Sequence, residues 1–212
     1  MEPSLIPAQA FAESGRALLG SIAGVLALTA TMPYLISIVR GRTLPSLASY
    51  LVWAAIECVG AASLIATLGP QPATWPRLAF AAGAVLIVLF CLRRQRHAPW
   101  TVVESGTLLI TGMSCLAWIL FDAPGVALIV SAIASAAAYT ATLRKTWRLP
   151  GTEDRSAWAL TCAASWTNLT LVPAIVSLAA LPIIISVLGS TSVTLVTFST
   201  RPRHPHPDPE GS

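Results

Sequence analysis

The chain has 212 residues, of which 55% are hydrophobic and only 10% are charged, and its formal net charge is +4. A soluble domain carries about a quarter charged residues. One soluble core cannot hold this much apolar sequence, so the composition indicates an integral membrane protein. The positive charge does not favour nucleic-acid binding, because the basic residues lie at the ends of apolar segments and not on one face.

Seven apolar segments approach the length of about 20 residues that a helix needs to cross a bilayer. They cover residues 17–39, 46–68, 75–92, 100–121, 125–143, 156–177 and 180–199. Turn signals separate most of them. The break near Ala179 is weaker, and we infer it partly because 156–199 is too long for one crossing. The predicted fold class is all-α transmembrane, with seven helices.

The distribution of basic residues predicts the orientation of these helices. Residues 1–16 contain Glu2, Glu13 and a single base, Arg16, so the positive start of a signal peptide is missing and the first segment is kept as a span. Cytoplasmic loops carry an excess of Lys and Arg. The N-terminus is therefore predicted outside and the C-terminus inside. Eleven of the 13 bases lie on the predicted inner side, the exceptions being Arg16 and Arg77; the eleven are Arg40, Arg42, Arg93, Arg94, Arg96, Arg144, Lys145, Arg148, Arg155, Arg201 and Arg203.

The first and second halves of the chain resemble each other at one fixed offset. A shift of 105 residues brings together Tyr34 and Tyr139, Arg40 and Lys145, Leu44 and Leu149, Pro45 and Pro150, Trp53 and Trp158, and Ala54 and Ala159. The pattern predicts an internal duplication. We expect parallel three-helix bundles at 17–92 and 125–199 and a linker helix within 93–124. An extracytoplasmic segment, 1–16, and a disordered cytoplasmic tail, 200–212, flank them.

A family resemblance follows from the turn after the first span. Pro33–Tyr34, then Arg40–Gly41–Arg42–Thr43 and Leu47–Ala48–Ser49, resembles the PQ-loop signature, with Tyr34 in the place of its glutamine. With a 3+1+3 arrangement, residues 17–199 look like the SWEET/PQ-loop superfamily. The resemblance implies a transporter with its substrate between the bundles. It also implies that Trp53 and Trp158 match the sugar-site tryptophans, although the third helix of each bundle lacks the expected asparagine.

Glu57 is the most informative single residue. It lies in the middle of the second span, where an ionisable side chain costs at least about 2.5 kcal/mol and usually marks a pathway. Trp53 is one helical turn away on the same face. The pair could hold a cation or stack a ring, and Glu57 is also the candidate for proton coupling, because we expect no Lys or Arg at comparable depth. The alternative is a protonated Glu57 that bridges helices.

Other candidates lie on the first, fifth and sixth spans. Trp158 and Asn168 share a polar stripe that would suit substrate binding, although Asn168 could equally stabilise helix packing. Tyr34 and Tyr139 lie near the inner ends of the first and fifth spans. They could form a cytoplasmic gate or belong to the interfacial aromatic belt. Pro33 lies inside the first span, where it would allow a hinge.

The sequence predicts a transporter, uniporter or proton-coupled, that moves a small polar metabolite such as a sugar, amino acid or nucleoside-like compound by alternating access. The alternative is a non-transporting receptor or scaffold of the same fold. We find no catalytic motif and expect no enzyme activity, cofactor or metal. Expected partners are the solute and the lipid bilayer, with a second copy of the chain as a further candidate, and no nucleic acid. Abundant Ala, Gly, Pro and Arg indicate a GC-rich bacterial genome, and the expected location is then the bacterial inner membrane.

Overall fold

A computed structural model of the chain describes residues 5–40, 47–94, 102–148, 153–172 and 175–199. Within these ranges the protein is all-α, with seven α-helices and one short 3₁₀ turn. The elements are α1 (Leu5–Val39), α2 (Leu47–Leu68), η1 (Pro72–Thr74), α3 (Trp75–Arg94), α4 (Val102–Phe121), α5 (Pro124–Arg148), α6 (Arg155–Leu169) and α7 (Ala180–Ser199). The predicted tail, 200–212, lies outside the described residues.

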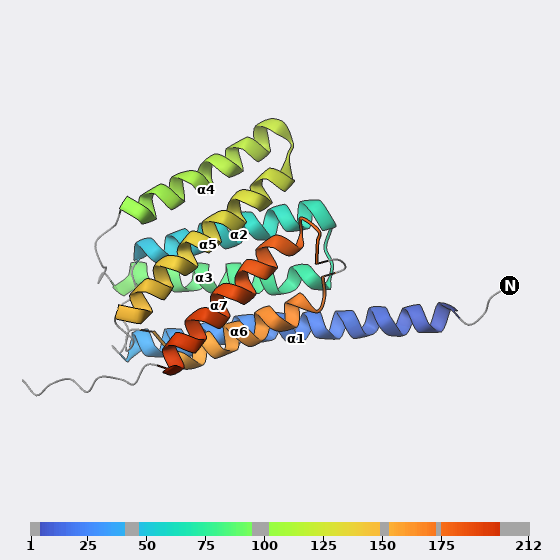
Figure 1. Cartoon of the computed structure of the whole chain (residues 1–212), viewed down its shortest axis with the longest axis horizontal. Helices are drawn as coiled ribbons and strands as arrows, with labels where there is room; N and C mark the ends of the chain where they lie inside the picture. Colours follow the sequence, from blue (N-terminus) through green and yellow to red (C-terminus); the bar gives the residue numbers. More distant parts are fainter. Residues whose placement is uncertain (1–4, 41–46, 95–101, 149–152, 173–174, 200–212) are drawn as a thin grey trace, which may run out of the picture.

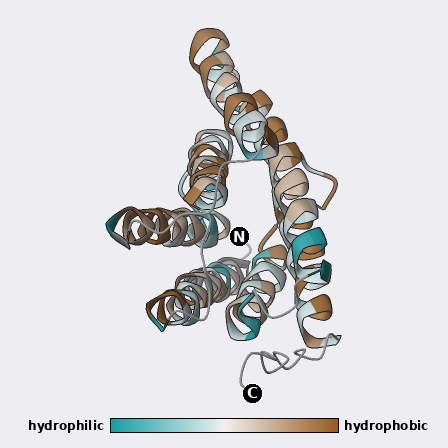
Figure 2. Cartoon of the chain, turned by 90° about the vertical axis from the view of Figure 1, so that its left-hand side faces the viewer, coloured by the Kyte–Doolittle hydropathy of each residue, from teal (hydrophilic) through white to brown (hydrophobic). Residues whose placement is uncertain are grey.

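Six of these helices are long and apolar enough to cross a membrane. They include Ala12–Val39 of α1 and Pro72–Arg93, which joins η1 to α3, together with α2, α5, α7 and most of α4. The large apolar side chains on their outward faces are exposed, such as Leu109 at 66% and Ile119 at 72%. Figure 2 shows these hydrophobic outer faces in brown. The chain is therefore a multi-pass membrane protein, and lipid is the natural solvent for those faces.

The sixth helix is shorter than the sequence predicted. The expected span was 156–177, but α6 has 15 residues and ends at Leu169. The next backbone N–H groups make tight bonds to carbonyls three residues back, from Thr170 to Thr167 at 3.2 Å and from Leu171 to Asn168 at 3.0 Å. Pro173 follows in the sequence. A proline at that position has no N–H to donate, and in a continued helix its ring would clash with the carbonyl of Leu169, which favours an end to the helix here.

The first helix is longer than the sequence predicted. It begins at Leu5, within the segment 1–16 that was expected to precede the span, and it has 35 residues. Pro33 lies inside it. The helix therefore continues through the proline to Val39, and η1 packs against its middle, where a Cβ on Gly20 would come within 2.6 Å of the carbonyl oxygen of Pro72.

The helices pack in two groups of three with α4 at one side (Figure 1). In one group α3 packs against both α1 and α2, and in the other α7 packs against both α5 and α6. The main contacts between the groups are α1 with α6 and α2 with α5, and α3 also makes a small contact with α6. The remaining long helix, α4, packs on α5 and α2. A space between the two groups is thus bordered by helices from both.

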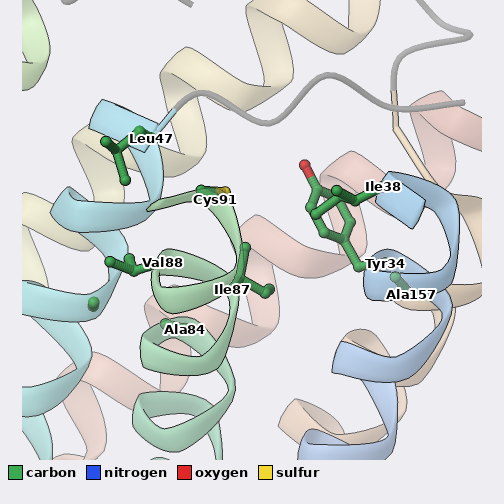
Figure 3. Close-up of a cluster of buried hydrophobic side chains, with 9 residues drawn as sticks. Tyr34, Ile38, Leu47, Ala84, Ile87, Val88, Cys91 and Ala157 are labelled. Carbon is green, nitrogen blue, oxygen red and sulfur yellow. The ribbon is translucent and has the colours of Figure 1, made fainter. Parts of the chain in front are cut away.

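One end of this bundle carries most of the described basic residues. Here α1, α3, α5 and α7 end and α2, α4 and α6 begin, at the left of Figure 1. Described bases at this end include Arg93, Arg144, Lys145, Arg148 and Arg155. We call it the basic end. Near it, Tyr34 of α1 projects between α1 and α3 in a buried apolar cluster with Ile38, Ile87 and Cys91 (Figure 3).

Candidate functional site

A cavity of about 120 Å³ lies between the two groups of helices, and we call it the central cavity. Side chains from α1, α2, α3, α5, α6 and α7 line it. Five residues that the sequence singled out meet here: Tyr34, Trp53, Glu57, Tyr139 and Trp158. The predicted one-turn spacing thus does place Trp53 and Glu57 on the same wall.

Three of these aromatic rings are in contact. The ring of Tyr139 lies edge-on to Trp53, with centroids 4.9 Å apart and an interplanar angle of 71°. It lies 6.2 Å from the ring of Trp158 at 60°. Such edge-to-face pairs are the favoured arrangement for aromatic side chains. The two tryptophans matched by the 105-residue offset therefore both contact one tyrosine.

Glycine and hydroxyl groups hold Tyr139 in this position. A Cβ on Gly189 of α7 would collide with the ring carbons of Tyr139, so the ring lies directly against that helix. The hydroxyl of Tyr139 is 3.2 Å from the hydroxyl of Ser186, which is 3.0 Å from that of Ser165. All three residues are buried. This hydrogen-bonded chain joins α5, α7 and α6 beside the cavity.

Glu57 is paired with an arginine. Nε of Arg77 lies 3.1 Å from Oε2 of Glu57, and the two residues are 3% and 7% exposed. The expectation that no Lys or Arg lies at comparable depth is therefore wrong. The sequence placed Arg77 at the outer end of its span, but its long side chain extends inward from the first turns of α3. A buried carboxylate costs far less when a cation accompanies it, which favours this direction.

The ion pair does not satisfy the hydrogen-bonding groups of either partner. Within the described part of the chain, Oε2 of Glu57 and Nε and Nη2 of Arg77 have no hydrogen-bond partner. The guanidinium lies against Gly60 of α2, where a Cβ would come within 2.6 Å of Nη2 and 3.0 Å of Nε. Gly60 thus lets Arg77 pack against the helix that carries Glu57, one turn from the carboxylate.

A second cavity, of about 130 Å³, lies nearer the basic end. We call it the end cavity. Its lining is more charged, with Glu104, Lys145 and Glu153. Four aromatic residues line both cavities: Tyr34, Tyr50, Trp53 and Trp158. We call these four the aromatic partition. Tyr34 and Tyr50 are in contact, with ring centroids 5.1 Å apart.

Glu153 links two helices at the end cavity. Its Oε1 accepts a hydrogen bond from Nζ of Lys145 at 2.8 Å, and its Oε2 accepts one from Nε1 of Trp158 at 3.0 Å. The Glu153 side chain is 5% exposed. On the other side of the cavity, the hydroxyl of Ser49 donates to Glu104 of α4. Trp158, which the 105-residue offset matches to Trp53, thus donates a hydrogen bond to a carboxylate at the basic end.

Two of the predicted site residues do not line the central cavity. Asn168 lies near the end of α6, buried, and its Oδ1 has no hydrogen-bond partner among the described residues. Pro33 lines a separate surface groove with Arg40 and Asp154. Substrate binding by Asn168 and hinge motion at Pro33 stay predictions, because neither residue lines the central cavity.

Sequence reasoning missed several residues of the site. Arg77 could have been found, because a carboxylate in the middle of a span calls for a partner and Arg77 is the base that begins the next apolar segment. Glu153 is an acidic residue inside a basic turn, which is a weaker signal. Tyr50, Phe80 and Ser186 also line the central cavity, and nothing in the sequence pattern separates them from ordinary packing residues.

Comparisons with known proteins found no matching protein-family model, curated protein or solved structure. Within the described residues, no group of three or more His, Cys, Asp or Glu side chains is placed to hold a metal ion. The three histidines, His97, His204 and His206, lie outside the described residues.

Proposed function

We propose that the protein is a bacterial inner-membrane transporter that moves a small polar solute by alternating access between two three-helix bundles of SWEET/PQ-loop type. The observation that carries the proposal is the central cavity. It lies between the two groups of helices, and residues matched by the repeat, Trp53 with Trp158 and Tyr34 with Tyr139, line it from both sides. Parallel repeats with substrate between them near mid-membrane are a known transporter design.

The packing of the helices supports a repeat of three plus one plus three. If α1, α2 and α3 are exchanged with α5, α6 and α7, the main contacts keep their pattern, and only the small contact of α3 with α6 lacks a counterpart of that size. The third helix of each group packs against the other two, and the contact of α1 with α6 becomes the contact of α5 with α2. The contacts of α4 with α5 and α2 have no counterpart under this exchange, as expected for a linker helix.

The two cavities support movement of solute along one path. The central cavity and the end cavity share the aromatic partition, so a solute that passes between them has to displace these rings. The bonds from Glu153 to Lys145 and Trp158 hold one side of that partition. In this proposal they break when the cavity opens toward the basic end, which the positive-inside rule predicts to be cytoplasmic. Uniport and proton coupling through Glu57 both fit, and no enzymatic step is proposed.

Uptake by purified protein in proteoliposomes tests this function. A panel of labelled sugars, amino acids, nucleosides and small amines is offered to vesicles with and without the protein. We expect saturable uptake of at least one solute, reduced at least tenfold by Trp53→Ala or by Trp158→Ala. Trp147→Ala is the matched control, because Trp147 is 69% exposed and lines neither cavity. No uptake of any solute, with folded protein in the vesicles, would favour a receptor or scaffold.

A further inference from the structure

The carboxylate of Glu57 has hydrogen-bonding capacity that the described protein does not use. Glu57 is 7% exposed and lines the central cavity. Its Oε2 faces Nε of Arg77 at 3.1 Å but has no hydrogen-bond donor among the described residues. An ionised carboxylate accepts up to about four hydrogen bonds, and buried polar groups normally have partners. A ligand that brings a donor into the cavity would supply one to this carboxylate.

The walls of the central cavity favour a positively charged donor. Of the residues that line it, six are aromatic: Tyr34, Tyr50, Trp53, Phe80, Tyr139 and Trp158. Glu57 is the charged residue of this lining, and Arg77 is not part of it. The face of an aromatic ring carries negative charge density and attracts a cation, more strongly where water is excluded. An anion would meet both the ring faces and the carboxylate.

The size of the central cavity restricts the ligand further. Its volume is about 120 Å³. An apolar cavity of about 150 Å³ holds a benzene molecule, so this one suits about six or seven non-hydrogen atoms. A hexose has about twice as many and exceeds that volume. A small amine or a compact quaternary ammonium compound has the required size.

From these observations we infer that the central cavity is a binding site for a small monovalent organic cation. The ammonium group lies beside the carboxylate of Glu57 and against the rings of Trp53, Tyr139 and Trp158. Arg77 remains beside the carboxylate, against Gly60. This inference rests on the proposed function only in one respect, which is that the bound cation would be the transported solute. Binding itself can be measured without transport.

Two probes of one shape test the inference on the wild-type protein. Choline and 3,3-dimethyl-1-butanol differ in a single central atom, which is a charged nitrogen in choline and a neutral carbon in the alcohol. Full-length protein in detergent is titrated with each by calorimetry, and its melting temperature is followed, because a ligand that binds the folded state raises apparent stability. We expect choline to bind at least tenfold more tightly than the alcohol.

Variants then locate the site. We expect Glu57→Gln to reduce choline affinity at least tenfold and Trp158→Ala to reduce it severalfold, whereas Trp147→Ala leaves it unchanged. Equal affinity for choline and its neutral analogue would overturn the inference, whether or not any variant folds. Choline affinity that persists in folded Glu57→Gln would also overturn it.

The outcomes separate this inference from the proposed function. If proteoliposomes carry another solute while choline shows no preference over the alcohol, the cation site is wrong and transport stands. If choline binds with the expected selectivity but no solute crosses the membrane, the site stands and transport is wrong. Glycine betaine is the carboxylate analogue of choline and is a zwitterion. If it binds more tightly than choline, the site prefers a zwitterion to a monovalent cation and the inference is rejected.

Discussion

The guanidinium of Arg77 and the carboxylate of Glu57 lie 3.1 Å apart inside the helix bundle, and each residue is more than nine-tenths buried. Removing one partner of a buried ion pair leaves an uncompensated charge, which typically costs about 3–5 kcal/mol. Replacing both partners by uncharged groups often costs much less. The pair therefore sets a stability requirement on any change at either position.

This requirement is tested by a double-mutant cycle. We expect Glu57→Gln to destabilise the protein by about 3–5 kcal/mol, because Arg77 keeps its charge and loses its partner. The double variant Glu57→Gln/Arg77→Met should recover a large part of that loss. The measurement is unfolding of purified protein in detergent, followed by circular dichroism. Additive effects of the two single changes would mean that the pair carries no coupling.

Gly60 should be intolerant of even one added methyl group. Its Cβ would lie 2.6 Å from Nη2 of Arg77, and overpacking of this kind typically costs about 1–3 kcal/mol. Gly106→Ala in α4 is the control, because a Cβ there meets nothing within 4 Å and alanine is the better helix former by about 0.5–1 kcal/mol. We expect Gly60→Ala to melt below wild type and Gly106→Ala at or above it. The Arg77→Met background should remove most of the Gly60→Ala penalty.

Tyr139 depends on Gly189 in a similar way. Because the tyrosine ring lies directly against that glycine, Gly189→Ala should push the ring into the central cavity and reduce both ligand affinity and uptake at least tenfold. Gly112→Ala, where a Cβ also meets nothing within 4 Å, serves as the control. Gly189→Ala with wild-type affinity would show that the ring position is unimportant to the site.

Reporter fusions test the membrane orientation. Fusions after residues 96 and 203 should report cytoplasm, and fusions after residue 71 or at residue 123 should report the exterior, because the loops richest in Arg and Lys stay inside. A C-terminus outside the cytoplasm would contradict the parallel repeat, which needs an odd number of crossings and an N-terminus outside.

Glu57→Gln should also separate binding from proton coupling in folded, reconstituted protein. The change keeps the shape of the side chain but removes the carboxyl that could carry a proton. We expect accumulation driven by an imposed pH gradient to disappear. Exchange of a neutral solute should survive, whereas exchange of a cation should fall because its counter-charge is gone. Wild-type accumulation in Glu57→Gln would exclude Glu57 as the proton carrier.

The sequence predicted the parts of this site that depend on helical periodicity and repetition. The 105-residue offset paired Trp53 with Trp158, and both reach the same cavity. It could not predict Arg77, since a long side chain near a helix end can extend toward either the interface or the interior. It also missed the end of α6, which is set by a local change of hydrogen bonding at Thr170 and Leu171. Pro173 is compatible with either a kink or an end of the helix, and the apolar composition does not distinguish the two.

The short sixth helix has a consequence for the surrounding lipid. Fifteen residues of α-helix rise about 22 Å, whereas the hydrocarbon core of a typical bilayer is about 30 Å thick. A protein whose apolar belt is lower on one side thins the membrane there or tilts, and both have an energetic cost that depends on acyl-chain length. Vesicles of short-chain phosphatidylcholine should therefore match the α6 side better than long-chain ones. Acyl-chain length should then shift the ratio of the conformations that alternating access requires, without any change in the central cavity.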